Sequence, residues 1–320
     1  MRHLINVIAS LAITIASLTA HSQSSYPTKN IRLIVPVGTG GPSDLVARLL
    51  GEKLAVALGK PVIVDNRPGA SQIIGANVVA KAEPDGYTLL QAAANMAINP
   101  LMVAEMPFDT IKDFAPVSMT HLTPYVVLVS AQSPVKSLPE LLKFIKGNPG
   151  KINFGMTGPG SPQQLATLLM AQMVGSLGSM TGVTYKGSTA AHPDLIAYRI
   201  SFMIDPLAAA APHVRSGLLR GLAVSTSQRN PSFPDIPTAS ESGVPGYEFS
   251  SWGGVFAPAR TPRAIVQKLN AEIGNALAIP DLSKRFTDMG LVAKHSTPEE
   301  FGKFLQAEIT RWSAVLAKKP

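Results

Sequence analysis

Strand-like and helix-like segments alternate along almost the whole chain, and this alternation limits the fold more than any other feature. IRLIVPV (31–37) is an apolar, β-rich run, and a helical pattern follows it from about Ser43 to Leu58. The same succession of strand, Gly/Ser/Pro turn and helix recurs at 151–175. Short apolar strands that alternate with helices predict parallel sheets covered on both faces. Two units of one plan therefore predict two α/β lobes that face each other across a cleft.

The remaining segments follow the same pattern. Further strands are expected at 61–66, 87–93, 114–120, 124–131, 151–156, 182–187, 201–205, 219–225 and 250–258. The last two helices are expected over 261–278 and 296–317. Thr261–Pro262 and Thr297–Pro298 stand at their starts, each a good N-cap followed by a good first helical residue. Proline, serine and glycine are frequent over 229–247, which predicts a long surface loop.

The first residues, MRHLINVIASLAITIASLTAHSQ, have the layout of an export signal. Arg2 supplies a positive charge, residues 4–20 are mostly apolar, and Ala20 and Ser22 are the small residues expected before a cleavage site. The apolar run is shorter than the roughly 20 residues of a membrane-spanning helix, and polar residues interrupt it. We therefore expect a signal peptide cleaved near Ser22 and Gln23, and a periplasmic mature protein, rather than a retained anchor.

Composition excludes several classes of function. The chain has no cysteine, which excludes disulfides, thiolate metal sites, a cysteine nucleophile and a lipid-modified cysteine. The net charge of +8 comes from scattered basic residues, only 6% of residues are aromatic, and no nucleic-acid-binding motif appears. A positive field suits small acidic solutes or an acidic membrane face better than nucleic acid. The histidines show no zinc-ligand spacing, so we expect no metal and no cofactor.

The stretch VGTGGPSD (37–44) raises the question of a phosphate loop. A dinucleotide fingerprint needs a third glycine where Ser43 stands, and a P-loop needs a lysine, which is missing between Ile31 and Leu50. Glycines that expose N–H groups before a helix N-terminus still suit an anion, and a carboxylate fits there as well as a phosphate. An ordinary tight turn capped by Ser43 or Gly41 explains the stretch equally well.

A second stretch, GPGSPQQ (158–164), occupies the matching place in the second unit. Ser161 can cap the following helix, Pro162 suits its first position, and Gln164 can complete a capping box. That local explanation is sufficient for Ser161 alone. Two anion-friendly helix starts in matching positions, however, can hold one acidic molecule between them.

Residues typical of catalysis are few. No serine lies in G-x-S-x-G, because Ser161 comes one place late. Asp205 ends an apolar strand, where a carboxylate either faces the cleft or caps the next segment. Lys186 is more simply a solvated loop lysine. An exported hydrolase that uses Ser161 and a distant histidine is an alternative function, and a ligand sensor for a signalling system is another.

The chain resembles the substrate-binding proteins of tripartite tricarboxylate transporters, the Bug or TctC-like family, over its mature length. The stretches that carry the resemblance include YPTKNIRLIVP, GGPSDLVAR, LGKPVIVDNRPGAS, IGANVVAKAEPDGYTLL, NPGKINFG, YKGS, PSFPDIPTASESGVPGYE, SSWGG, FAPARTP and STPEEF. The resemblance implies a periplasmic binding protein fold, type II-like, with two α/β lobes joined by two crossover strands around a ligand cleft. The implied division is a signal peptide over 1–22, lobe I over 25–124, lobe II over 125–246, and the second part of lobe I over 247–320.

The resemblance also implies a function. Such proteins bind a dicarboxylate, tricarboxylate, acidic amino acid or aromatic acid, and present it to membrane permease subunits. We therefore expect a non-enzymatic receptor, a monomer, without nucleic acid as partner. The expected ligand-binding residues are Gly38, Thr39, Gly40, Gly41, Pro42, Ser43, Asn95, Thr157, Gly158, Gly160, Ser161, Gln164 and Asp205.

Two departures lie where the ligand would bind. The first loop of many relatives reads P-P-G-G-G-T-D, whereas GTGGPSD occupies 38–44 here. The second loop often ends in S-Q-H, whereas Gln164 stands in place of the histidine. The identity of the carboxylate therefore cannot be carried over from any relative.

Overall fold

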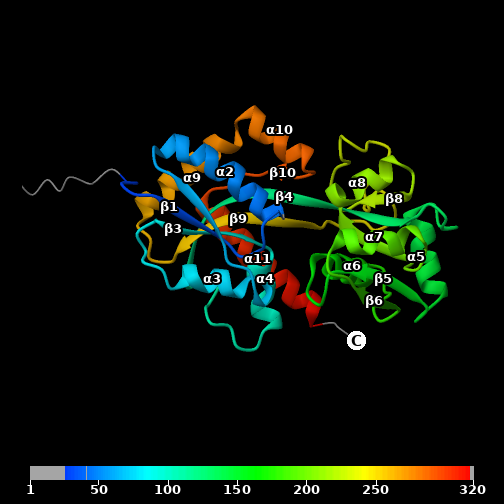
Figure 1. The fold of residues 1–320 in the computed structure, drawn as a ribbon. Helices are drawn as coiled ribbons and strands as arrows, with labels where there is room; N and C mark the ends of the chain where they lie inside the picture. The colour runs from blue at the N-terminus through cyan, green and yellow to red at the C-terminus, as the bar shows by residue number, and fades with distance from the viewer. Residues whose placement is uncertain (1–25, 41, 318–320) are drawn as a thin grey trace, which may run out of the picture.

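The computed structural model describes residues 26–40 and 42–317, which form two lobes side by side (Figure 1). The named strands belong to one ten-stranded sheet in the order β2-β1-β3-β9-β4-β7-β5-β6, with β8 and β10 each paired to β4. In lobe I, helices α2, α9 and α10 lie on one face of the sheet, and α3, α4 and α11 lie on the other. The signal peptide predicted over 1–22 lies outside the described residues.

Lobe I combines the early and the late parts of the chain. Its elements are β1 (Ile31–Val35), α2 (Pro42–Leu58), β2 (Val62–Asn66), η2 (Ala70–Gln72), α3 (Ile73–Ala80), β3 (Thr88–Ala93), α4 (Asn95–Met102), β9 (Ser250–Pro258), α9 (Arg263–Leu277), α10 (Pro280–Asp288), β10 (Val292–Ala293) and α11 (Pro298–Leu316). Lobe II is formed by the middle of the chain. Its elements are α5 (Leu138–Gly147), β5 (Ile152–Met156), α6 (Pro162–Met173), β6 (Met180–Thr184), α7 (Ser188–Ile196), β7 (Phe202–Pro206), α8 (Leu207–Arg215) and β8 (Leu219–Val224).

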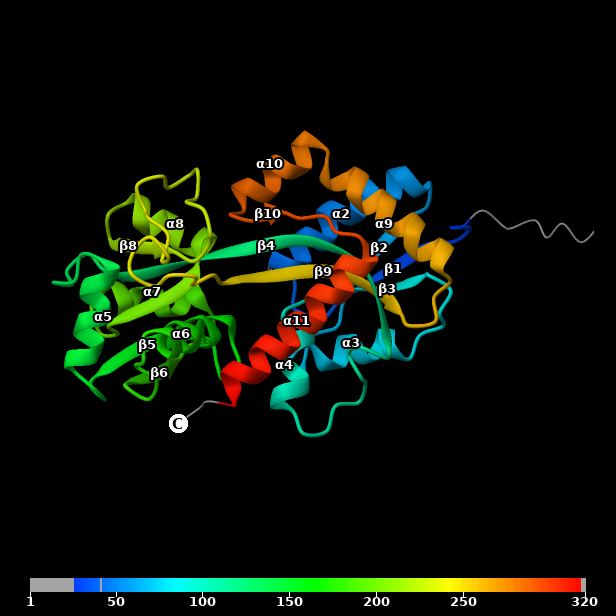
Figure 2. The same ribbon diagram turned by 180° about the vertical axis from the view of Figure 1, so that it is seen from behind.

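One long strand, β4 (Phe114–Ser130), passes from lobe I into lobe II (Figure 2). Residues 114–124 pair with β9, and residues 125–130 pair with β7 and β8. The prediction of two separate strands, 114–120 and 124–131, is wrong in this respect. Pro116 and Pro124 cannot donate to a ladder, and the strand tolerates Pro116 through a register shift beside it. The expected lobe boundaries at 124 and 246 stay a prediction.

The two lobes repeat one strand order. Lobe I reads β2-β1-β3-β9-β4 and lobe II reads β6-β5-β7-β4-β8, so that β4 has in lobe II the place that β9 has in lobe I. In both lobes the first two strands pair in parallel and the fourth is antiparallel to the third. The turns after β1 and β5 therefore occupy equivalent positions at the carboxyl ends of their strands, where ligands of open α/β sheets bind.

The C-terminal helix α11 packs against β9 in the core of the protein. Trp252 on β9 and Trp312 on α11 are almost fully buried. Both indole N–H groups donate to Oε2 of the buried Glu308, over 3.2 and 3.0 Å. Polar tips of buried tryptophans need such partners, and this shared carboxylate joins helix and strand.

The two predicted C-terminal helix starts have different outcomes. Thr297 forms a full capping box with Glu300 at the start of α11, which confirms that prediction. Helix α9 instead begins at Arg263 with Pro262 as its N-cap, and the buried Thr261 hydroxyl has no hydrogen-bond partner within the described structure. The threonine–proline pair of α9 is therefore one residue too early to cap.

Candidate functional site

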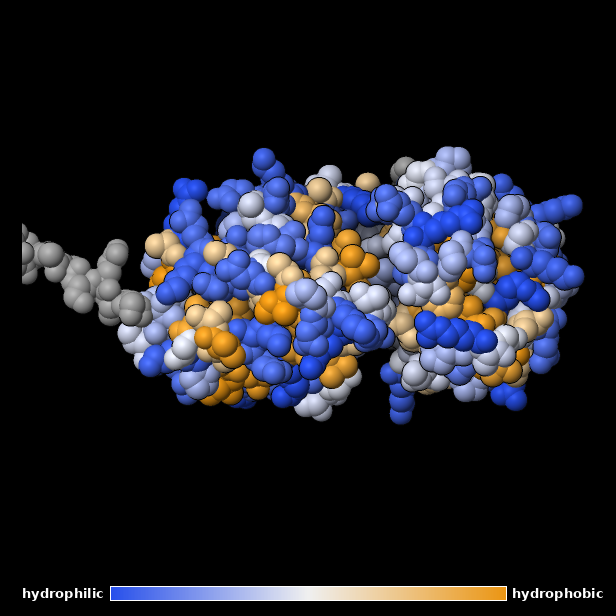
Figure 3. All heavy atoms as spheres, turned by 90° about the horizontal axis from the view of Figure 1, so that it is seen from above, coloured by the Kyte–Doolittle hydropathy of each residue, from blue (hydrophilic) through white to orange (hydrophobic). Residues whose placement is uncertain are grey.

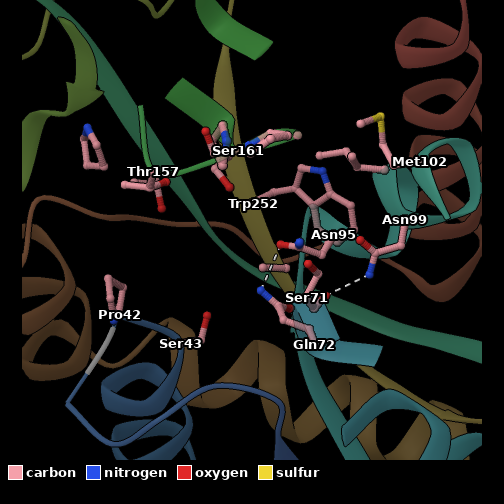
Figure 4. A pocket seen from close by; sticks show the side chains of 18 of the residues that line it. Pro42, Ser43, Ser71, Gln72, Asn95, Asn99, Met102, Thr157, Ser161 and Trp252 are labelled. Carbon is pink, nitrogen blue, oxygen red and sulfur yellow. Dashed lines mark hydrogen bonds between the residues drawn. The ribbon is translucent and has the colours of Figure 1, made fainter. Parts of the chain in front are cut away.

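A cavity of about 420 Å³ lies between the two lobes. Figure 4 shows Pro42 and Ser43 of lobe I on one side and Thr157 and Ser161 of lobe II on the other. The described residues that line it are Pro42, Ser43, Ser71, Gln72, Ala93, Asn95, Ile98, Asn99, Met102, Val103, His121, Thr123, Tyr125, Thr157, Pro159, Gly160, Ser161, Pro162, Pro206, Ser251 and Trp252. The two predicted loops therefore face one shared space.

The first predicted loop reaches the cavity through its last residues, Pro42 and Ser43. Three of its predicted residues are exposed and do not line the cavity, namely Gly38, Thr39 and Gly40. Gly41 lies outside the described residues. The part of this loop that faces the cavity is therefore the start of α2 rather than the whole glycine-rich stretch.

Asp44, in the first turn of α2, holds the first loop in its turn. Its buried carboxylate accepts hydrogen bonds from the Gly40 backbone N–H at 2.9 Å and from Asn66 Nδ2 at 2.9 Å, and it pairs with Arg48 at 3.0 Å. Burial by itself would raise the pKa of this carboxyl, but the hydrogen bonds from Arg48, Gly40 and Asn66 outweigh it and hold the pKa below its usual range. The Gly40 N–H is thus satisfied within the protein.

The second predicted loop contributes Thr157, Gly160 and Ser161 to the lining, whereas Gly158 and Gln164 do not line the cavity. Ser161 caps α6 by accepting the Gln164 N–H at 3.4 Å. The Gln164 side chain, however, accepts from the Gly160 N–H at 2.7 Å and not from the Ser161 N–H, so the predicted capping box is not formed.

The two loops share one local construction. Gly40 and Gly160 both have positive φ, 85° and 75°, a conformation that favours glycine. Each donates its N–H to the side chain four residues later, Asp44 in lobe I and Gln164 in lobe II. The repeat seen in the strand order therefore extends to hydrogen bonds in the loops.

Asn95, the first residue of α4, lies beside a strained turn at the cavity wall. Its Oδ1 is 2.8 Å from Gln72 Nε2 (Figure 4). Gln72 is the last of three consecutive non-glycine residues with positive φ, the others being Ala70 and Ser71. Asn99 Nδ2 donates to the Ser71 carbonyl at 2.8 Å and holds this turn. Such conformations cost free energy, and they cluster at ligand sites.

Asp205 is the predicted residue that the structure separates from the cavity. Its carboxylate is fully buried and is not among the lining residues. Three side chains occupy its oxygens, namely Ser188 Oγ at 2.6 Å, His192 Nε2 at 2.9 Å and Gln163 Nε2 at 3.2 Å. The prediction that this carboxylate contacts the ligand directly therefore does not agree with the described structure, in which three donors already surround it.

His121 lines the cavity although the sequence did not single it out. Its ring lies against Gly253 on β9, where an added Cβ would come within 2.2 Å of the ring carbon Cε1. Burial lowers the pKa of this imidazole to about 4, so the ring is neutral near pH 7. Thr120 Oγ1 lies 3.0 Å from Nδ1. Little in the sequence indicates this role, because His121 falls between 114–120 and 124–131, which are predicted as separate strands.

The described lining residues include no lysine, arginine, aspartate or glutamate. Four described helices begin at the cavity instead: α2 at Pro42, α4 at Asn95, α6 at Pro162 and α8 just after Pro206. Each helix N-terminus carries roughly half a positive charge. A small anion in this cavity is therefore surrounded by neutral hydrogen-bond donors and helix dipoles rather than by a cationic side chain.

Other chemistry finds little support within residues 26–40 and 42–317. No group of three or more potential metal ligands gathers there. No hydrogen bond joins the Ser161 hydroxyl to a histidine in the same residues, and this hydroxyl instead accepts from the Gln164 backbone N–H. Across the same residues no helix combines the length and apolar character that crossing a membrane requires.

Comparison with known proteins agrees with this geometry. A sequence model of the tripartite tricarboxylate transporter family receptor, TctC, matches residues 46–320. The protein BugT of Bordetella pertussis is 35% identical over 318 residues, which cover 99% of this chain and 97% of BugT.

Two solved structures are also similar. R. palustris Rpa4515, solved with adipate, is 35% identical with a TM-score of 0.79, over 91% of this chain and 97% of that one. MatC from Rhodopseudomonas palustris, solved with bound malate, is 33% identical with a TM-score of 0.75, over 91% of this chain and 99% of that one. The periplasmic binding fold with two α/β lobes is thereby confirmed.

Proposed function

The chain belongs to the tripartite tricarboxylate transporter receptor family, and on that premise we propose that it captures a small organic acid in the periplasm and delivers it to membrane permease subunits. The family is one of solute-binding receptors. We further propose that the ligand is a carboxylate, that the signal peptide is cleaved, that the receptor is a monomer and that it catalyses no reaction.

One observation carries the proposal: a cavity of about 420 Å³ whose described walls lack ionised side chains and receive the N-termini of four helices. A carboxylate fits such an environment because oriented N–H and O–H dipoles replace its hydration without a fixed counter-charge. His121 at the wall is neutral near pH 7 and adds no charge to the cavity. Adipate with Rpa4515 and malate with MatC are acids of comparable kind.

The proposed mechanism is closure of the two lobes on the acid. Lobe I binds one carboxylate at the start of α2, at Pro42 and Ser43. Lobe II then covers it with Thr157 and Ser161, and Asn95 contacts the remainder of the ligand. Because β4 and the segment that leads into β9 connect the lobes, a rotation about these strands closes the cavity.

The test is a screen of the mature protein by thermal unfolding against organic acids, sugars and cations. A ligand at 100 times its dissociation constant stabilises the folded state by about 2.7 kcal/mol. We expect stabilisation by at least one carboxylate. Stabilisation by sugars or cations alone would refute the proposal, and loss of uptake of that acid in a deletion strain would test delivery to the permease.

A further inference from the structure

The second loop carries a chain of hydrogen bonds that leads from the cavity wall to a buried charge. Thr157 Oγ1 lies 3.0 Å from Gln163 Oε1, and Gln163 Nε2 lies 3.2 Å from Asp205 Oδ1. Gln163 and Asp205 are buried, at 4% and 0% exposure. Thr157 is the member that lines the cavity. Asp205 determines which group donates and which accepts in each of these hydrogen bonds.

Asp205 fixes the orientation of the Gln163 carboxamide. An ionised carboxylate only accepts hydrogen bonds, and the other two side chains on Asp205, Ser188 and His192, are both able to donate. The NH₂ group of Gln163 must therefore face Asp205, because the reversed amide would bring two oxygens into buried contact. The Gln163 carbonyl oxygen is then left facing Thr157.

The orientation of Gln163 in turn determines what Thr157 offers a ligand. A hydroxyl has one proton and two lone pairs. Because the Gln163 carbonyl can only accept, Thr157 donates its one proton to Gln163, and this proton points away from the cavity. Thr157 presents lone pairs to the ligand. Ser161 on the same loop differs, since its oxygen accepts the Gln164 N–H and its own proton is free to be donated.

We propose that Asp205, acting through Gln163 as a positioning residue, makes Thr157 a hydrogen-bond acceptor, and that the ligand is a carboxylate bearing a hydroxyl or amino group beside Thr157. This inference rests on the proposed function and narrows its substrate class. The helix N-termini and Ser161 suit the carboxylate, whereas Thr157 suits an O–H or N–H group. An acid without such a group leaves the Thr157 lone pairs unpaired in the closed cavity, which costs affinity.

The test compares acids that differ by one donor group. Calorimetric titration uses succinate against L-malate, D-malate and L-aspartate, and adipate against 2-hydroxyadipate and 2-aminoadipate. In the series that fits the cavity, the best donor-bearing acid is expected to bind about three- to tenfold tighter than its unsubstituted partner, the range that one net hydrogen bond supplies.

Variants locate the preference at Thr157. Thr157→Val keeps the shape and should bring the affinity ratio close to one, whereas Thr157→Ser should keep it. Gln163→Leu frees the Thr157 proton and should lower the ratio without removal of the hydroxyl. Asp205→Ala removes the acceptor that orients the Gln163 carboxamide, so the NH₂ group can turn toward Thr157, and the ratio should fall likewise. Thermal unfolding of each variant checks that it is folded.

The outcomes separate the inference from the function on which it rests. A preference for unsubstituted acids, or an unchanged ratio in both Thr157→Val and Gln163→Leu, would overturn the inference and leave a carboxylate receptor. If no acid of the panel bound, the proposed function would fail and the inference with it. Ser161→Ala is the matched control, since it should weaken both members of a pair equally.

Discussion

Acidification should destabilise this protein through His121. The imidazole is 3% exposed, and burial lowers its pKa to about 4 from an ordinary value of 6.5. Between pH 6.5 and 4 the unfolded chain therefore binds a proton at this residue that the folded chain does not. Stability decreases as the pH decreases wherever the unfolded state binds more protons. The loss therefore begins near pH 6.5 and is complete near pH 4.

The magnitude follows from these two values. Linkage between a pKa of 6.5 in the unfolded chain and about 4 in the folded chain removes about 2 kcal/mol of stability at pH 5 relative to pH 7. That loss is a large share of the 5–15 kcal/mol typical of a folded domain. It is therefore well above the error of a denaturation experiment.

The assay is urea unfolding of the mature protein without ligand at pH 7, 6 and 5. His121→Asn removes the titrating ring, so its stability should fall by about 2 kcal/mol less than that of the wild type between pH 7 and 5. His295→Asn, at an exposed position, is the control for loss of a histidine as such. Parallel curves for His121→Asn and the wild type would refute the assignment of the linkage to His121.

Three further perturbations test the packing beside the site, a helix cap and the strained turn. Gly253→Ala should lower the free energy of unfolding by about 1–3 kcal/mol, because its Cβ meets the His121 ring. The added change His121→Ala should restore part of that loss. It should not rescue the control Gly254→Ala, whose Cβ meets Phe301 and the Ser118 carbonyl. Thr297→Ala should cost about 1 kcal/mol in chemical denaturation, because it removes the side-chain cap of α11. Asn99→Leu removes the bond to the Ser71 carbonyl, and should speed amide hydrogen exchange over 70–73 relative to α6; unchanged exchange there would contradict a strained turn held by Asn99.

Most of the fold followed from local pattern. The strand segments at 31–37 and 151–156, each followed by a Gly/Ser/Pro turn and a helix, were predicted close to the observed β1–α2 and β5–α6 units. Local signals suffice there because each unit is contiguous in sequence. The continuity of β4 did not follow, since its pairing partners, β9 and β7, lie far along the chain and override the two prolines.

The site was predictable in the turns between a strand and the helix that follows it. Ser43, Asn95 and Ser161 line the cavity as expected because each lies at the beginning of a helix that follows a strand. His121 and Trp252 lie in strand interiors, and nothing in their neighbours marks which face of the sheet they occupy. Their contribution depends on where β4 and β9 cross between the lobes, and that is a property of the tertiary fold.

The glycine-rich loops show why a motif alone leaves its function open. Their N–H groups suggested direct contact with an anion, yet Gly40 donates to Asp44 and Gly160 donates to Gln164 within the protein. The two glycines are required either way, because positive φ forms both turns. A sequence pattern therefore records that the backbone turns, but not whether the N–H exposed by the turn binds a ligand or a side chain four residues later. In this chain the internal acceptors take those two protons, and the helix starts and the hydroxyls of Thr157 and Ser161 are left to face the cavity.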